Sequence, residues 1–301
     1  MNSTYNISSE KLDNPLLKEL LTRLTDFFQK IDTDYYVIGA TARDLVLHNV
    51  YNIQPSRKTS DLDIAIAITD WGQFDAIVEL LPREVNFSKD KSQLQRFLYK
   101  DLFKIDIVPF GSIANESGFI YWQSAGERRM SVVGFRQMAE FALTVRIDDG
   151  LPIKVASLPG VFVLKLSAWK DRHLENNKDA YDMALLIGNY YEIHIERIAY
   201  EHFDILEDDD FDDFIAGGKL MIRDVKEMLM DEKQALDYVK CIIAEEVEKE
   251  KESPLINQIL ETSKQLKYEQ VLRLLQEILK ELISTRPRVT KHGGDTKTAI
   301  E

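Results

Sequence analysis

The feature that most constrains the fold is a strictly alternating run of eight residues, Asp-Leu-Asp-Ile-Ala-Ile-Ala-Ile, which begins at Asp61. Such alternation predicts a β-strand that buries one face against a core. The large apolar residues share that face, and Asp61 and Asp63 lie on the other, about 7 Å apart. Because neighbouring carboxylates repel each other, the pair indicates either a chemical site or a polar strand start. An isolated Asp-x-Asp motif favours the second interpretation, since short motifs match by chance.

A strand followed by a glycine turn precedes this run. The residues Tyr-Tyr-Val-Ile at 35–38 predict a short buried strand that ends at Gly39, Ala40 and Thr41, after which the pattern is helical. Free amides at a helix start and the helix dipole both favour an anion, so the turn is a candidate phosphate site. A tight turn also needs glycine for its backbone alone. Arg43, on the following helix, either contacts phosphate or pairs with nearby acids.

A third carboxylate follows on a predicted hairpin, whose strands span residues 95–99 and 102–108 and turn at Lys100-Asp101. Asp106 lies between two isoleucines on the second strand, which indicates an edge strand or a site. Together with Asp61 and Asp63 it completes the set of carboxylates that a two-metal centre requires, because hard divalent cations bind carboxylate oxygens.

Two consecutive helices are predicted between residues 160 and 190. Lys165 and Arg172 share one face of the first helix, and Asp179 and Asp182 lie three residues apart on the second. Charged faces of amphipathic helices are usually solvated, and an acid in a first turn can simply complement the helix dipole. These four residues therefore also have a purely structural interpretation.

Charge excludes one class of function. The net charge of −13 divides into −3 for residues 1–190 and −10 for residues 191–301. Seven acids between Asp204 and Asp213 supply most of the second value and are expected to form a solvated linker or helix start. A protein that coats nucleic acid non-specifically carries the opposite charge, although a locally basic cleft can still hold a nucleotide or an RNA end.

The chain is expected to be cytoplasmic. It has no apolar run that approaches a membrane span and no signal-peptide pattern at its start, so no membrane partner is expected. Its single cysteine, Cys241, excludes an internal disulfide framework and a cysteine-rich zinc site. At 301 residues it is long enough for two domains. We expect a loose N-terminus (1–13), a core domain with a short mixed sheet and flanking helices (14–157), an all-helical C-terminal domain (158–284) and a disordered tail (285–301).

The order of these motifs resembles the DNA polymerase β-like nucleotidyltransferase superfamily, which has a Gly turn, an Asp-x-Asp strand and a later third Asp. Residues 37–45 are also similar to the Gly-Gly-x-x-Arg-Asp opening of tRNA nucleotidyltransferases, but the downstream basic motifs of those enzymes are absent, so CCA addition is not expected. Residues 158–186 resemble the AbiEii/AbiGii-type toxin nucleotidyltransferases. The matching residues are Lys165 and Ala168 of Lys-x-x-Ala, then Arg172, then Lys178, Asp179 and Asp182 of (Arg/Lys)-Asp-x-x-Asp.

The resemblance covers roughly residues 30–225 and implies an α+β (α/β) nucleotidyltransferase fold that uses an NTP with Mg²⁺ or Mn²⁺. It implies that the metal is bound by Asp61, Asp63 and Asp106, and that phosphate is bound by Gly39, Ala40, Thr41 and Arg43. Lys165 and Arg172 would contact the triphosphate. Asp179 would orient Lys165 or act as a base, and Asp182 would only brace the two helices.

By the same resemblance, the acceptor hydroxyl belongs to an RNA end such as that of tRNA, and the role is that of a type IV toxin or phage-defence effector with a cognate antitoxin from a neighbouring gene. Two alternatives stay open. One is nucleotidylation of a protein or of a small molecule such as an antibiotic. The other is an inactive module that binds nucleotide or a partner. Ala40, where the superfamily prefers Ser or Gly, favours inactivity, and the three intact acids favour catalysis.

Overall fold

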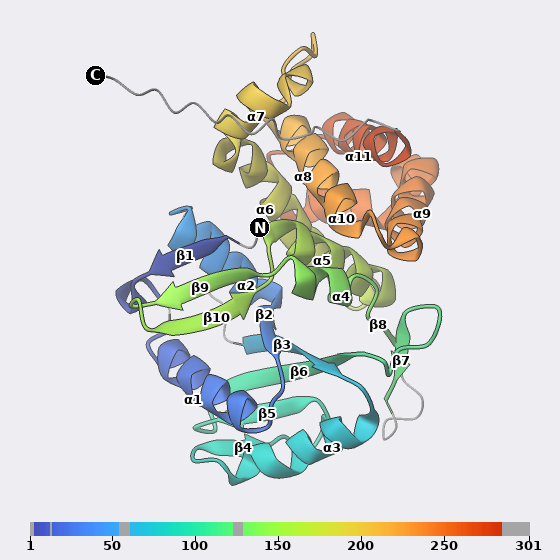
Figure 1. Cartoon of the computed structure of the whole chain (residues 1–301). Coiled ribbons are helices and arrows are strands. Elements are labelled where there is room, and N and C mark those ends of the chain that lie inside the picture. Colours follow the sequence, from blue (N-terminus) through green and yellow to red (C-terminus); the bar gives the residue numbers. More distant parts are fainter. Residues whose placement is uncertain (1–2, 13, 54–60, 123–128, 285–301) are drawn as a thin grey trace, which may run out of the picture.

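The computed structural model describes residues 3–12, 14–53, 61–122 and 129–284 (Figure 1). Its centre is a mixed sheet with the strand order β1-β9-β10-β2-β3-β6-β5-β4. The strands of this sheet are β1 Thr4–Ile7, β2 Tyr35–Ile38, β3 Asp61–Ile68, β4 Phe87–Lys89, β5 Arg96–Tyr99, β6 Phe103–Gly111, β9 Leu143–Ile147 and β10 Leu151–Val155. A separate hairpin joins β7 Phe119–Tyr121 and β8 Arg129–Ser131.

Strand β3 lies in the middle of the sheet, antiparallel to β2 and parallel to β6. The predicted alternation is confirmed, because Leu62, Ile64 and Ile66 are completely buried while Asp61 and Asp63 are only partly covered. The predicted strand over residues 35–38 and the hairpin that contains Asp106 are also present. The mixed sheet is therefore as predicted in kind, and it is larger than predicted because β1 and β4 also join it.

Helices cover the sheet, and every described element after β10 is a helix (Figure 1). None of the helices in the described ranges is long and apolar enough to cross a membrane. That the helices after residue 158 form a domain of their own stays a prediction. The helices are α1 Leu16–Lys30, α2 Gly39–Asp44, α3 Trp71–Leu80, α4 Phe135–Glu140, α5 Leu158–Arg172, α6 Lys178–Ile193, α7 Ile195–Glu201, α8 Asp213–Leu229, α9 Lys233–Lys249, α10 Pro254–Thr262 and α11 Tyr268–Ile283.

The expectation of a loose N-terminus is wrong for residues 4–7. They form β1, which pairs in parallel with β9, and Ile7 at its end is 5% exposed. Four residues are too few to show a period, and the partner strand lies about 140 positions further along the chain. The predicted disordered tail, residues 285–301, lies outside the described residues.

The acidic run before α8 contributes to helix capping and to ion pairs. Asp212 accepts a hydrogen bond from the amide of Ile215 at 3.1 Å and so caps α8, as a predicted helix start would. Asp208 pairs with Arg273 of α11 at 2.8 Å. These contacts anchor the start of α8 and tie the segment before it to α11.

Helix α8 crosses α6 at a glycine, and this contact gives a testable prediction. A Cβ on Gly217 would lie 2.4 Å from the carbonyl oxygen of Ile187, which is backbone and cannot move aside. We expect Gly217→Ala to lower the free energy of unfolding by about 1–3 kcal/mol in urea denaturation.

The matched control for this variant is Gly188→Ala on α6, where a Cβ would meet only ordinary contacts at 3.7 Å. We expect the control to be neutral or to stabilise by up to about 1 kcal/mol, because Ala favours helix over Gly. Equal effects of the two substitutions would show that the helix crossing is not closely packed at Gly217.

Candidate active site

The Asp-x-Asp strand and the third acid meet on neighbouring strands. Asp63 of β3 is in register with Asp106 of β6, and Asp61 lies two residues before Asp63 on the same face. Burial is the largest influence on Asp63 and raises its pKa to about 6. The nearby charges of Lys165 and Arg172 oppose this rise, and those of Asp106 and Asp61 add to it. The structure therefore brings the two predicted acids of β3 into one electrostatic neighbourhood with the predicted cations of α5.

Asp106 carries a partner that the sequence analysis did not include. Arg96 of β5 lies directly opposite it, and its Nε and Nη2 donate to Oδ1 and Oδ2 of Asp106 at 2.8 and 2.7 Å. Such a two-pronged pair uses both carboxylate oxygens and is among the strongest hydrogen-bonded ion pairs.

This pairing bears directly on the predicted metal centre. Oxygen donors of this kind are the ones that Mg²⁺ and Mn²⁺ prefer. However, within the described ranges no group of three or more His, Cys, Asp or Glu side chains is arranged to hold a metal ion. While Arg96 holds Asp106, the arrangement of Asp61, Asp63 and Asp106 does not fit a three-carboxylate metal site.

The glycine turn is built against Asp63. Helix α2 begins at Gly39, whose φ of +65° lies in the left-handed region that glycine tolerates best. A Cβ there would also approach Oδ2 of Asp63 to 2.3 Å. Thr41 is buried and its hydroxyl donates to the carbonyl oxygen of Asp61 at 3.0 Å, so this side chain ties the turn to β3. Phosphate binding by the amides of Gly39, Ala40 and Thr41 stays a prediction.

Arg43 is not exposed toward the pocket. Its side chain is 0% exposed, its Nε donates to Asp44 Oδ1 at 2.7 Å, and its guanidinium also pairs with Asp182 of α6. This geometry corresponds to the alternative in which Arg43 pairs with acids, and it does not support the predicted phosphate contact. Asp182, expected only to brace the two helices, is completely buried between two cations, because its Oδ2 also lies 2.7 Å from Lys165 Nζ.

The ion pairs continue along α5 and α6. Lys165 Nζ donates to Asp179 Oδ1 at 3.1 Å, and Arg172 donates twice to Asp179, at 2.8 and 3.0 Å. Burial works to raise the pKa of Asp179, but the two cations outweigh it and lower the pKa. Burial likewise works to lower the pKa of Lys165, but Asp182 and Asp179 outweigh it and raise the pKa. We call this chain of alternating charges the ion network; its members are Asp44, Arg43, Asp182, Lys165, Asp179 and Arg172.

A pocket with about 600 Å³ of empty space lies at the end of the ion network. Gly39, Asp63, Lys165 and Arg172 are among the residues that line it, together with residues of β6, β8 and α4. Arg172 keeps 46% of its side chain exposed, whereas Lys165 keeps 12%. The pocket therefore presents one carboxylate of the Asp-x-Asp strand to two fixed cations.

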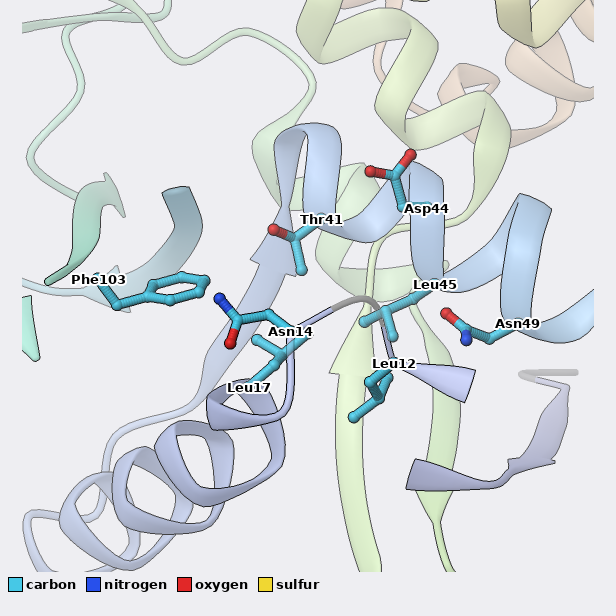
Figure 2. Close-up of a pocket in the computed structure, with 8 residues that line it drawn as sticks. All are labelled: Leu12, Asn14, Leu17, Thr41, Asp44, Leu45, Asn49 and Phe103. Atoms are coloured by element: carbon cyan, nitrogen blue, oxygen red, sulfur yellow. The ribbon is translucent and has the colours of Figure 1, made fainter. Parts of the chain in front are cut away.

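A second pocket lies along α2 and the start of α1 (Figure 2), with about 360 Å³ of empty space. Figure 2 shows apolar side chains gathered at its centre and the Asp44 carboxylate directed away from them. Among the residues that the structure describes, its lining carries neither a lysine nor an arginine, so this part of the lining lacks the charge that a triphosphate requires. The lining residues are Leu12, Asn14, Leu17, Thr41, Asp44, Leu45, Asn49 and Phe103. The pocket at Asp63 is the candidate active site.

Comparison with known proteins identifies the family. The sequence pattern of one family, described as nucleotidyl transferase AbiEii toxin of type IV toxin–antitoxin systems, matches residues 20–262. The chain belongs to the AbiEii family. As an AbiEii protein it is a transferase enzyme of the nucleotidyltransferase class, and the family implies an NTP substrate and an antitoxin partner. The match includes both the sheet strands of the pocket and the whole ion network.

Two solved structures are similar to this AbiEii protein. The antibiotic-resistance factor ANT(2'')-Ia has 15% identity over 63% of this chain and 94% of its own, with a TM-score of 0.34. A CCA-adding enzyme with ATP has 14% identity over 90% of this chain and 82% of its own, with a TM-score of 0.31. No protein of curated function matches the sequence. At these TM-scores the likenesses do not assign a substrate.

Proposed function

We propose that this AbiEii protein transfers a nucleotide from an NTP to the 3′ hydroxyl of an RNA such as tRNA, and that it acts as a toxin or phage-defence effector. The observation that carries the proposal is the pocket in which Asp63 faces Lys165 and Arg172. Two cations beside a partly buried carboxylate and a glycine turn suit a triphosphate at the point where its α-phosphate is attacked.

The ion network holds these cations ready for the substrate. Lys165 stays protonated at neutral pH because Asp182 and Asp179 raise its pKa. In the proposed mechanism Lys165 acts as a point charge on the triphosphate, and the half-exposed guanidinium of Arg172 offers a fork to a phosphate. Asp179 is then a positioning residue, because it contacts both cations at once. Fixed charges of this kind lower the barrier without reorganising during the reaction.

The proposal includes a divalent cation, Mg²⁺ or Mn²⁺, with Asp61, Asp63 and Asp106 as its candidate ligands. Since Asp106 is held by Arg96 in this structure, the requirement rests on the kind of oxygen donors present and on the family. Removal of divalent cations with EDTA is expected to abolish transfer, and addition of Mg²⁺ or Mn²⁺ to restore it.

One observation favours a different acceptor. The chain carries a net charge of −13, most of it after residue 190, and this repels an extended polyanion such as RNA. A protein hydroxyl or a small molecule such as an antibiotic would be free of this penalty and is the second candidate acceptor. The two candidates share the donor pocket and differ only in what approaches it.

Label transfer distinguishes these acceptors. Each of the four NTPs, labelled at the α-phosphate, is incubated with the protein, Mg²⁺ or Mn²⁺ and total bacterial RNA. We expect label on RNA from one NTP and none with the double variant Asp61→Ala/Asp63→Ala. Label on protein instead of RNA would overturn the RNA proposal and support the second candidate. An absence of label on both RNA and protein, with nucleotide bound, would leave a small-molecule acceptor or an inactive binding module.

A further inference from the structure

The pair between Arg96 and Asp106 is built into the sheet. Tyr99 pairs with Phe103 across the β5–β6 hairpin, and this register places Arg96 opposite Asp106. Both side chains are largely covered, with 21% of Arg96 and 19% of Asp106 exposed. The two hydrogen bonds, 2.8 and 2.7 Å long, are as short as those of strong charge-assisted pairs.

The surroundings place further positive charge near Asp106. Lys89 of β4 acts on Asp106 electrostatically while its ammonium group donates to backbone carbonyl oxygens of the same hairpin, including those of Gln93 and Arg96. A divalent cation at Asp106 would therefore meet a guanidinium that already uses both carboxylate oxygens. The cation and the Arg96 guanidinium would repel each other strongly, because both would lie next to one carboxylate where water is partly excluded.

A second carboxylate lies within electrostatic reach of Arg96. Asp90, directly after β4, is partly exposed and acts on the Arg96 guanidinium together with Asp106 and Asp61. Its Oδ1 accepts hydrogen bonds from Ser92 and Gln93. The amide of Asp90 donates to the carbonyl oxygen of Arg96 at 3.1 Å, so the two residues stay neighbours whichever way the arginine side chain points. An arginine that leaves Asp106 thus has another acid to approach.

We propose that Arg96 occupies Asp106 in the cation-free enzyme and competes with a divalent cation for this carboxylate, so that cation binding requires Arg96 to turn toward Asp90. The inference rests on the cation requirement within the proposed function and adds a residue that sets cation affinity. Arg96 is a positioning residue in this account, because it acts on the site through Asp106.

Cation affinity measures the competition without any need for activity. Mn²⁺ binding to the full-length protein is followed by electron paramagnetic resonance and by isothermal titration calorimetry. Arg96→Lys keeps the charge and removes the fork, and Arg96→Gln removes both. We expect Arg96→Gln to bind Mn²⁺ about tenfold more tightly than the wild-type protein, the loss of a charge-assisted pair being worth roughly that factor. We expect Arg96→Lys to bind Mn²⁺ more tightly than the wild-type protein but less tightly than Arg96→Gln, because lysine keeps the positive charge.

Two controls separate competition from a change of local field. Lys104→Gln removes one positive charge from an exposed residue of β6 that is in register with Asp61. We expect it to tighten Mn²⁺ binding less than Arg96→Gln does. In an Asp106→Asn background, Arg96→Lys is expected to leave Mn²⁺ affinity unchanged, because the shared carboxylate is gone.

The Mn²⁺ affinities test the competition separately from the proposed function, which is tested by label transfer. Equal effects of Arg96→Gln and Lys104→Gln, or wild-type affinity in Arg96→Lys, would overturn the competition. Tighter Mn²⁺ binding in both Arg96 variants would support it even if label transfer detected no acceptor. Circular dichroism of each variant identifies any loss of affinity that comes from unfolding. If Arg96→Gln does not fold, Arg96→Lys still tests the competition.

Discussion

Asp63→Asn is expected to reduce nucleotidyl transfer by on the order of 10³-fold, equivalent to about 4 kcal/mol of transition-state stabilisation. Asn preserves the volume and removes the charge at the one acid of the Asp-x-Asp pair that lines the pocket with Lys165 and Arg172. The measurement is the initial rate of label transfer at saturating NTP.

The same variant is expected to be at least as stable as the wild-type protein at pH 8. Burial raises the pKa of Asp63 from 3.8 to about 6, so the folded state disfavours the charged carboxylate. This penalty grows as the pH rises from about 4 through about 6, is fully present above that range, and is absent in the Asn variant.

Asp75→Asn, on the exposed face of α3, is the matched control and is expected to change neither rate nor stability. Full activity of Asp63→Asn would remove Asp63 from the proposed site. Loss of activity together with loss of stability would assign Asp63 a structural role.

Asp182→Asn is expected to lower the free energy of unfolding by about 3–5 kcal/mol, because removal of one partner leaves buried charge uncompensated. Asp182 and Arg43 are both 0% exposed, and Lys165 Nζ lies 2.7 Å from the remaining oxygen of Asp182. Through these pairs a single carboxylate of α6 ties together α2 and α5. Urea denaturation followed by circular dichroism gives the value.

Glu192→Gln is the control, because Glu192 is an exposed acid of the same helix. We expect it to stay within about 0.5 kcal/mol of the wild-type protein. A comparably small effect of Asp182→Asn would show that Asp44 and Asp179 are sufficient partners for the two cations. In that case the ion network would not hold α2 against α5 and α6.

Local sequence patterns determined most of the elements around the site. Alternation predicted β3 and placed Asp61 and Asp63 on one face, as the structure has them. The run at 35–38 followed by Gly39 predicted a strand that passes directly into a helix, which is β2 and α2. These features are set by neighbours along the chain, so a short window contains the information. The motif on α5 and α6 indicated the family that the comparison then identified.

The sequence prediction missed the partner of Asp106 because its register for the pairing of β5 with β6 was wrong by one residue. A two-residue turn at Lys100-Asp101 would pair Tyr99 with residue 102 and place residue 95 opposite Asp106. The structure instead pairs Tyr99 with Phe103, with Lys100 and Asp101 both at positive φ, and so brings Arg96 to Asp106. A two-residue turn and a three-residue turn can both connect these two strands, so the alternating pattern alone does not distinguish the two registers. A comparison of both turn lengths would have exposed Arg96 as a candidate.

Only the tertiary structure decided which charges meet. The sequence itself determined the strands, the glycine turn and the helix faces, because side-chain period and backbone preference act over a few residues. It could not show that Arg43 is buried against Asp182, 139 positions away, or that residues 4–7 complete the sheet beside β9. Such pairs form because a buried charge requires an opposite one and a strand edge requires a partner, and neither requirement specifies where in the chain that partner lies.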